Sequence, residues 1–177
     1  HEAGINERGE AFYTMKFVRG TTLRQIIDQL RERDPAALER CPLAVLLTIF
    51  QKVCDAVAFA HSKGVIHRDL RPSNIMVGAY GEVLVMDWGH AKLTSEAASD
   101  ISSTPAGTDL DGVIFGMPLY MAPEVAEGTT SGGERSDVYA LGAILYRMLA
   151  LHPPIEGKDA MEVCERLRAG KIIPLSQ

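Results

Sequence analysis

The chain has 177 residues, of which 46% are hydrophobic, and this size and composition predict one folded domain rather than a disordered segment. A net charge of −5 without any run of Lys or Arg argues against a nucleic-acid partner. The cysteines Cys41, Cys54 and Cys164 are far apart and form no CxxC pair, so neither a disulfide framework nor a zinc site is predicted, and a reducing compartment such as the cytoplasm fits best.

The hydropathy pattern predicts no membrane segment within the chain, because no apolar stretch reaches about eighteen residues. The first residue is His1 rather than Met, which suggests that the chain is part of a longer protein. Membrane tethering of the full-length protein therefore remains open.

Residues 12–18, FYTMKFV, alternate in hydropathy and predict a strand that RGTT ends. A helix with one buried face follows and stops in the charged RERDP; its apolar residues recur at helical spacing at Leu23, Ile26, Ile27 and Leu30. After a loop through Cys41 and Pro42, a second helix is predicted to end at Gly64, a glycine C-cap. The apolar face of this second helix holds Leu46, Phe50, Val53, Cys54 and Val57.

Short strands are predicted at residues 75–77 and 83–86, on either side of the turn AYGE. Residues 89–116 show little periodicity and are rich in Ser, Thr, Gly and Asp, which predicts a long loop of the kind that is usually functional or mobile. Two more helices are marked by apolar faces, the first by Val138, Leu141, Gly142 and Leu145, the second by Ala160, Val163, Cys164 and Leu167 before Gly170. The predicted layout is mainly helical, with a few short strands that hold the polar motifs.

Polar residues gather in HRDLRPSN, residues 67–74, and in MDWG, residues 86–89. Asp69 and Asn74 lie on one loop, and Asp87 follows the next strand, so a hairpin would bring the three together. Two carboxylates and an amide can bind Mg²⁺ through oxygen while one carboxylate stays free as a base. The spacing therefore favours phosphoryl transfer.

Each of these residues also has a plain structural explanation when it is taken alone. An isolated loop aspartate such as Asp69 more often caps a turn. A packed core histidine is the preferred interpretation of His67, because nothing requires its imidazole to exchange protons. Arg68 and Arg71 alone would more often be solvated surface residues.

Taken together and in this order, HRDLRPSN, MDWG, GMPLYMAPE and SDVYALG resemble four motifs of eukaryotic-like (Hanks-type) serine/threonine protein kinases. The motifs are the catalytic loop, the metal-binding motif, the end of the activation segment and the central helix. The segments MDWGHAK and RSDVYALGAILYRMLALHPPIEG are most similar to those of bacterial serine/threonine kinases of this type. The resemblance implies an α+β fold, mainly α-helical, with the large lobe of a kinase and short β-hairpins.

The same resemblance implies transfer of the ATP γ-phosphate to Ser/Thr hydroxyls of a protein substrate, with ATP and Mg²⁺ as cofactors. By matching position, Asp69 would orient the substrate hydroxyl and accept its proton, while Asn74 and Asp87 would hold Mg²⁺ against the nucleotide phosphates. Arg71 stands where the family usually has Lys near the transferred phosphate, which keeps the charge in a wider, planar group.

The nucleotide base would be bound by residues at the predicted hinge. Met15 resembles the gatekeeper, the backbone groups of Lys16 and Val18 would bond the adenine edge, and Met76 would cover the adenine from below. Methionine and valine at such positions are also common as plain core residues.

Further matches concern structure and regulation. Residues 122–124 resemble the anchor of the activation segment, and Asp137 resembles the buried aspartate that holds the catalytic loop. Trp88 replaces the usual Phe and is expected to pack with His67 beside it. Arg68 would pair with a phosphate in the long loop, although a solvated Ser-rich loop explains the same residues; the candidate hydroxyls are Ser102, Ser103, Thr104 and Thr108.

Two departures from the family pattern bear on activity. Met117 stands where the family usually has Thr, whose hydroxyl meets the catalytic aspartate, and a thioether cannot replace that hydrogen bond. No GxGxxG occurs, and Lys16 is the sole lysine before the first helix. We therefore expect residues 1–20 to be the end of the small lobe and the hinge, and residues 21–177 to be a C-terminal lobe without its last helices. Alone, this fragment should be inactive.

Three functions of different kinds stay open. The first is a protein kinase completed by a longer chain. The second is a pseudokinase that binds partners, favoured by Met117 and the missing lobe but opposed by the intact Asp69, Asn74 and Asp87. The third is a small-molecule phosphotransferase with an HxDxxxxN loop, opposed by MAPE and the long activation segment.

Overall fold

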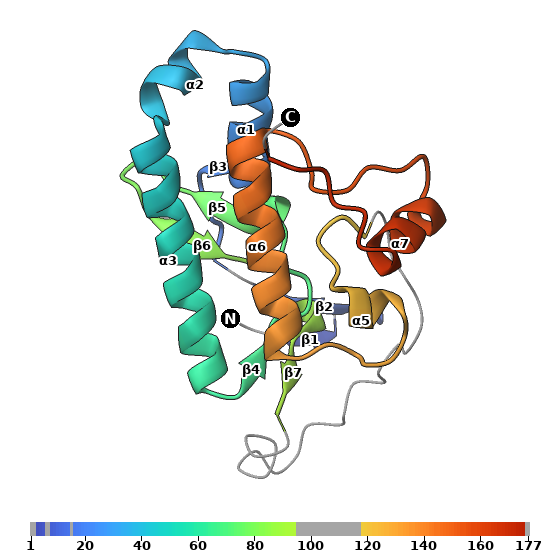
Figure 1. Cartoon of the computed structure of the whole chain (residues 1–177). Coiled ribbons are helices and arrows are strands. Elements are labelled where there is room, and N and C mark those ends of the chain that lie inside the picture. Colours follow the sequence, from blue (N-terminus) through green and yellow to red (C-terminus); the bar gives the residue numbers. More distant parts are fainter. Residues whose placement is uncertain (1–2, 6–7, 15, 95–117, 176–177) are drawn as a thin grey trace.

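The computed structural model describes residues 3–5, 8–14, 16–94 and 118–175, and it has the mainly helical α+β architecture that the sequence predicts (Figure 1). The α-helices are α1 Leu23–Arg31, α2 Pro35–Arg40, α3 Leu43–Ser62, α5 Pro123–Ala126, α6 Glu134–Ala150 and α7 Ala160–Arg168. The strands are β1 Ala3–Ile5, β2 Ala11–Tyr13, β3 Thr21–Thr22, β4 Val65–Ile66, β5 Ile75–Val77, β6 Val83–Val85 and β7 Lys92–Leu93. Two short 3₁₀ turns, η1 Pro72–Asn74 and η2 Trp88–His90, lie in the polar motifs.

Helix α1 confirms the periodicity read from the sequence, because the four predicted apolar residues are the ones that it buries. Its first turn is fixed by a capping box: the backbone N–H of Gln25 donates to the Thr22 hydroxyl, and the Gln25 side chain accepts from the backbone N–H of Thr22. The helix ends at Glu32, inside the charged stretch. Thr22 also belongs to β3, so the cap ties the start of α1 to the sheet.

Helices α3 and α6 run side by side and form the main axis of the molecule (Figure 1). The β5–β6 hairpin packs against α3, and one hydrophobic core joins the two helices, α1 and this hairpin. Its most deeply buried side chains include Leu23, Ile27, Val53, Ile75 and Ile144. The polar loop between β4 and β5 packs on this core through Leu70 and Ile75.

The strands form three small sheets. Strand β5 lies between β3 and β6, and both pairings are antiparallel. Strand β4 pairs with β7, so the chain just before HRDLRPSN is bonded to the chain just after MDWG. The two polar motifs are therefore held beside each other from both ends.

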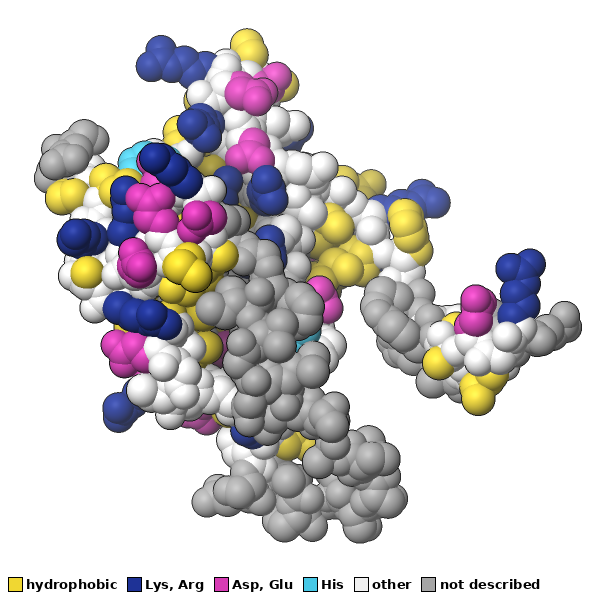
Figure 2. All heavy atoms as spheres, turned by 90° about the vertical axis from the view of Figure 1, so that its right-hand side faces the viewer, with side chains coloured by type: hydrophobic (Ala, Val, Ile, Leu, Met, Phe, Trp, Pro, Cys, Tyr) yellow, Lys and Arg dark blue, Asp and Glu magenta, His cyan; other side chains and the backbone are white. Residues whose placement is uncertain are grey.

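Strands β1 and β2 form a separate antiparallel hairpin that projects from the body of the molecule (Figure 2). The predicted strand at residues 12–18 is shorter than expected: β2 ends at Tyr13, and the described residues that follow it, up to Arg19, belong to no strand. Phe12 is 43% exposed, and hydrophobic side chains gather where the hairpin leaves the body. Alternating hydropathy here marks a partly exposed hairpin rather than a long buried strand.

Helices α5 and α7 pack together in a second, smaller core beside α6. Three of the four predicted apolar residues of α7 are buried, namely Val163, Cys164 and Leu167. In α6 the buried face differs from the predicted one at its first turn: Val138, which was expected to be buried, is 60% exposed, whereas the preceding Asp137 is buried. The reason is that this turn of α6 faces the HRDLRPSN loop, whose backbone N–H groups donate to the Asp137 carboxylate.

Helix α3 bears on the prediction that the chain has no membrane segment. It is the one described helix that is long and apolar enough to cross a membrane, by length and composition only. Core helices of globular domains pass the same test, and α3 contributes Leu46, Ile49, Val53 and Val57 to the core. Length and composition alone therefore leave the membrane prediction unconfirmed.

Candidate active site

The loop HRDLRPSN is fixed from below by one buried carboxylate. Asp137, in the first turn of α6, is 1% exposed. Its Oδ2 accepts the backbone N–H of His67 at 2.9 Å, and its Oδ1 accepts the backbone N–H of Arg68 at 2.9 Å. His61, at the end of α3, contacts Oδ2 through Nε2 at 2.8 Å. These contacts confirm that Asp137 holds the loop, and His61 is a partner that the sequence did not reveal.

His67 is the packed core histidine that we preferred, with 1% of its surface exposed. Its Nδ1 lies 3.2 Å from the backbone N–H of Asp69 and its Nε2 lies 3.0 Å from the carbonyl oxygen of Met86. An N–H faces Nδ1 and a carbonyl faces Nε2, an arrangement that suits the tautomer with its proton on Nε2. His67 therefore bridges the loop to the residue before Asp87.

Asp69 and Asn74 are in direct contact across the loop. The Asn74 amide nitrogen donates to both the carbonyl oxygen and the Oδ2 of Asp69, each at 2.9 Å. Two acceptors on this side fix the orientation of the amide, so its Oδ1 points the other way. Asp69 keeps a second carboxylate oxygen, Oδ1, that makes no hydrogen bond within the described chain.

Asp87 is placed next to this pair by the β5–β6 ladder. The backbone N–H of Met86 donates to the Asn74 carbonyl at 2.8 Å, so the pairing of the strands continues to the residue before Asp87. Asp87 has φ and ψ of 63° and 63°, in the left-handed region, which is uncommon for non-glycine residues although aspartate adopts it more often than most. The hairpin thus brings the two motifs together as the sequence predicts.

Trp88 confirms a further expectation. Its ring lies 4.5 Å from that of His67, at an interplanar angle of 57°, and its indole N–H donates to the Val85 carbonyl at 3.0 Å. The side chain is nevertheless 37% exposed. The Trp88 ring packs against His67, and its hydrogen bond to Val85 stabilises the turn that contains Asp87.

The oxygen groups of this site fit a magnesium ion shared with phosphates. Asn74 Oδ1 and the exposed carboxylate of Asp87 have no hydrogen-bond partner among the described residues, and both are hard oxygen donors. Mg²⁺ is usually held by one or two protein groups, with water and substrate phosphates as its other ligands. No cluster of three acidic, His or Cys side chains occurs in the described part of the chain, so a metal cage made by protein alone is not formed there.

Arg71 lies near Asp69, on the same loop. Both residues line a small cavity of about 90 Å³ whose opposite wall is Tyr120, before α5. The Arg71 Nε atom is buried and has no hydrogen-bond partner among the residues that the structure describes. A guanidinium with an unused donor beside the Asp69 carboxylate is suited to bind an anionic oxygen.

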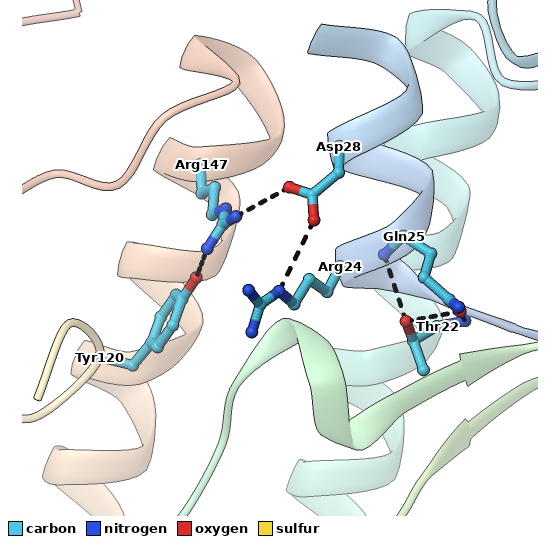
Figure 3. A network of polar contacts seen from close by, with 6 residues as sticks. All are labelled: Thr22, Arg24, Gln25, Asp28, Tyr120 and Arg147. Carbon is cyan, nitrogen blue, oxygen red and sulfur yellow. Dashed lines mark hydrogen bonds and ion pairs between the residues drawn. The ribbon is translucent and has the colours of Figure 1, made fainter. Parts of the chain in front are cut away.

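Tyr120 is held by a polar network that sequence reasoning missed (Figure 3). Its hydroxyl accepts from Arg147 of α6 at 2.6 Å, and the same guanidinium donates to Asp28 of α1 at 3.1 Å. Asp28 also pairs with Arg24 at 3.6 Å. The network links α1, α6 and the segment before α5, although these are far apart in sequence.

Burial is the main reason that the pKa of Tyr120 lies above its ordinary value of 10.0; Arg147, Arg71 and Arg24 act in the opposite direction. The phenol therefore stays protonated, and the hydroxyl keeps its hydrogen bond, throughout the neutral range. A hydroxyl that accepts from Arg147 still has its own proton to donate.

The anchor at residues 122–124 is bonded to the neighbouring helices. Glu124 accepts from the Ser136 hydroxyl at 3.1 Å, which ties α5 to the start of α6. The Arg168 guanidinium of α7 donates to the Ala126 carbonyl at the end of α5. The end of the predicted activation segment is therefore fixed on both sides.

The predicted adenine contacts are partly described. Lys16 is exposed and Val18 half-buried, and the backbone groups of neither form hydrogen bonds within the described chain, which leaves them available to a base edge. Met76 is half-buried and is paired with Thr22 across β3 and β5. Met15 lies outside the described residues.

Other predictions fall in residues 95–117, which are also outside the described part. They concern Met117 and the four candidate phosphorylation hydroxyls, Ser102, Ser103, Thr104 and Thr108. Arg68, the proposed partner of such a phosphate, has a positive φ of 66°, and its Nε donates to the His90 carbonyl at 2.7 Å. The pairing itself stays a prediction.

Comparison with known proteins agrees with this geometry. The family model described as "Protein kinase domain" matches residues 4–174. Proteins named "Serine/threonine-protein kinase PknD" are similar: that of Protochlamydia amoebophila is 42% identical over 158 residues, and that of Chlamydia caviae 39% over 166. These matches cover 82% and 88% of this chain but 16% and 18% of the relatives, so the chain spans less than a fifth of their length.

Proposed function

The chain belongs to the protein kinase domain family, and we propose that, within a longer kinase domain, it transfers the γ-phosphate of ATP to Ser or Thr hydroxyls of a protein substrate. The observation that carries the proposal is the Asp69–Asn74 contact beside Asp87, on a loop held by the buried Asp137. The relatives named as serine/threonine-protein kinases support the substrate class.

In this proposal Asp69 orients the substrate hydroxyl and accepts its proton. One of its oxygens is occupied by the Asn74 amide, which fixes the direction in which the other oxygen faces. Asn74 Oδ1 and the Asp87 carboxylate would hold Mg²⁺, which supplies charge neutralisation at the phosphates when it is bound. Arg71, with its unpaired Nε, would bind an oxygen of the transferred group.

The scaffold contributes mainly by positioning. Hydrogen bonds from His67 and Arg68 to Asp137 fix the backbone on which Asp69 sits, and the bond from His67 to Met86 sets the place of Asp87. Positioning of reactants can contribute about 7 to 11 kcal/mol of a barrier. A rigid loop therefore accounts for much of the proposed rate enhancement.

The 177 residues alone are proposed to be inactive. They contain no GxGxxG, and Lys16 is the sole lysine before α1, so these residues hold the triphosphate from one side only. The full-length protein would supply the other side. The three cysteines Cys41, Cys54 and Cys164 are free, which suits the cytoplasm, where MgATP is available.

The rival functions make different predictions about nucleotide and substrate. A pseudokinase module would bind partners without transferring phosphate, and a small-molecule phosphotransferase would not need the anchored segment at residues 118–124. The bonds that fix this segment beside the 90 Å³ cavity favour a protein substrate.

The proposal is tested by calorimetric titration of MgATP into the full-length protein and two variants. Asp87→Ala removes a metal ligand and should weaken Mg²⁺-dependent binding at least tenfold, whereas Asp69→Asn removes the base and should leave the affinity within about twofold. Equal affinity of the wild type and Asp87→Ala would contradict the assigned metal site.

A further inference from the structure

A second cavity, of about 520 Å³, lies apart from the polar motifs. It is bounded by α2, the first half of α3, the end of β5 and the β5–β6 turn. None of Asp69, Asn74 or Asp87 lines it. Its volume falls in the range of about 300 to 1,000 Å³ that is usual for small-molecule sites.

The inner wall of this cavity is apolar. Ile26 of α1 and Ile49 of α3 are nearly fully buried, with 2% and 4% of their surfaces exposed, and Val77 at the end of β5 is half-buried. Val45 of α3 is 38% exposed and lies nearer the mouth. An aliphatic or aromatic group would bury apolar surface against these side chains, at about 25 cal/mol per Å².

Two cations line the cavity. The Arg40 guanidinium donates to the side-chain oxygen of Gln29 at 3.2 Å, and the Lys52 ammonium donates to the carbonyl oxygen of Gly81 at 2.7 Å. Both partners are neutral, and neither cation lies within 4.0 Å of a carboxylate in the described part of the chain.

No acidic residue lines this cavity, although the chain has a net charge of −5. Glu82, in the adjoining turn, accepts the backbone N–H of Tyr80 at 2.9 Å and is not part of the lining. The charged side chains of the lining, Arg40 and Lys52, are therefore both positive, while the Glu82 carboxylate lies beside the lining residue Gly78. The two cations match a ligand with a negative group.

We propose that this cavity binds a small amphipathic monocarboxylate from solution. Its aliphatic or aromatic body lies between Ile26, Ile49 and Val77, and its carboxylate accepts charge-assisted hydrogen bonds from Arg40 and Lys52. Each cation has donors left after its present bond: Lys carries three N–H donors and Arg five. Binding needs no residue of the candidate active site, so the proposal stands or fails separately from the phosphoryl-transfer function.

The experiment titrates decanoate into the chain below its micelle concentration and follows binding by calorimetry. Decanol and decyltrimethylammonium, which have the same alkyl chain, serve as neutral and cationic controls. We expect saturable one-to-one binding of decanoate, with decanol at least about tenfold weaker and no binding of the ammonium compound.

Variants locate the site. Arg40→Gln with Lys52→Gln should weaken decanoate binding at least about tenfold, and Val45→Asp should do the same by placing a negative charge near the mouth. The matched control is Arg31→Gln with Lys63→Gln, which makes the same charge change at exposed cations outside the lining and should bind like the wild type. Urea unfolding curves of all variants verify that each is folded.

Three results of the binding experiments would overturn the proposal. They are no saturable binding of decanoate, equal affinity for decanol, and unchanged affinity in both folded cavity variants. A concentration-dependent dimer that Arg40→Gln with Lys52→Gln dissociates would also overturn it, because the cavity would then hold a second copy of the chain.

Discussion

Replacing Asp137 by Asn tests whether one buried carboxylate fixes the catalytic loop. The wild-type side chain accepts from three donors, with the His67 N–H and His61 on Oδ2 and the Arg68 N–H on Oδ1. An Asn amide has one acceptor oxygen. In either orientation its NH₂ faces a backbone N–H, so one buried donor loses its acceptor.

The magnitude follows from these contacts. An unsatisfied buried donor costs about 1 to 3 kcal/mol, and the remaining hydrogen bonds weaken by roughly 0.5 to 1 kcal/mol each when the acceptor loses its charge. Two such bonds remain, so the expected loss of unfolding free energy is about 2 to 5 kcal/mol. Because about 1.4 kcal/mol corresponds to a factor of ten, amide exchange at His67 and Arg68 should accelerate by roughly 30- to 4,000-fold.

Urea unfolding and NMR-detected hydrogen exchange of the chain measure both quantities. Asp159→Asn is the matched control: Asp159 caps α7 by accepting the Glu162 N–H at 2.8 Å, and Asn caps as well as Asp, so we expect a change below about 0.5 kcal/mol. If Asp137→Asn costs no more than this control, or if the two loop amides keep their protection, the reasoning is refuted.

Three other outcomes are expected. Burial raises the pKa of Tyr120 above 10.0, so the unfolded chain releases this proton first and the free energy of unfolding falls as pH rises past about 10. In Tyr120→Phe the fall between about pH 9 and 11 should be smaller, and urea unfolding at each pH measures it. Gly20→Ala should destabilise the chain by about 1 to 3 kcal/mol, because the added Cβ would lie 2.5 Å from the Val77 carbonyl oxygen, and an unchanged urea midpoint would contradict this close approach. The 177-residue chain should transfer no radiolabelled phosphate under conditions in which the full-length protein does, and Asp69-dependent transfer by the short chain would refute the need for a second phosphate-binding segment.

The long helices could be predicted from the sequence because their apolar residues recur at helical spacing. Helix α1 buries the four residues that the pattern marks, and α3 ends before Gly64, whose φ of 68° is typical of a glycine C-cap. Helix α2 was missed because six residues, PAALER, are too short to show a periodic face. Its cap Asp34, followed by Pro35, was the signal that could have revealed it.

The residues of the site that lie within sequence motifs could be predicted. The contacts between side chains that are distant in the sequence could not. HRDLRPSN and MDWG located Asp69, Asn74 and Asp87, and the β5–β6 pairing brought the two motifs together. The bonds from Arg147 to Tyr120 and Asp28 join residues 27 and 119 positions apart, and no spacing rule indicates such contacts. The 520 Å³ cavity is likewise built from segments between Gly20 and Gly81, which only the fold assembles.

The most direct test of the account is the rate of γ-phosphate transfer to a generic Ser/Thr protein substrate by the full-length protein and by its Asp69→Asn variant. If Asp69 accepts the hydroxyl proton, the variant should lose at least about 100-fold in rate, the usual contribution of a general base, while its MgATP affinity stays within about twofold. Asp159→Asn should transfer phosphate like the wild type. A wild-type rate in Asp69→Asn would contradict the assignment of this loop as the catalytic centre.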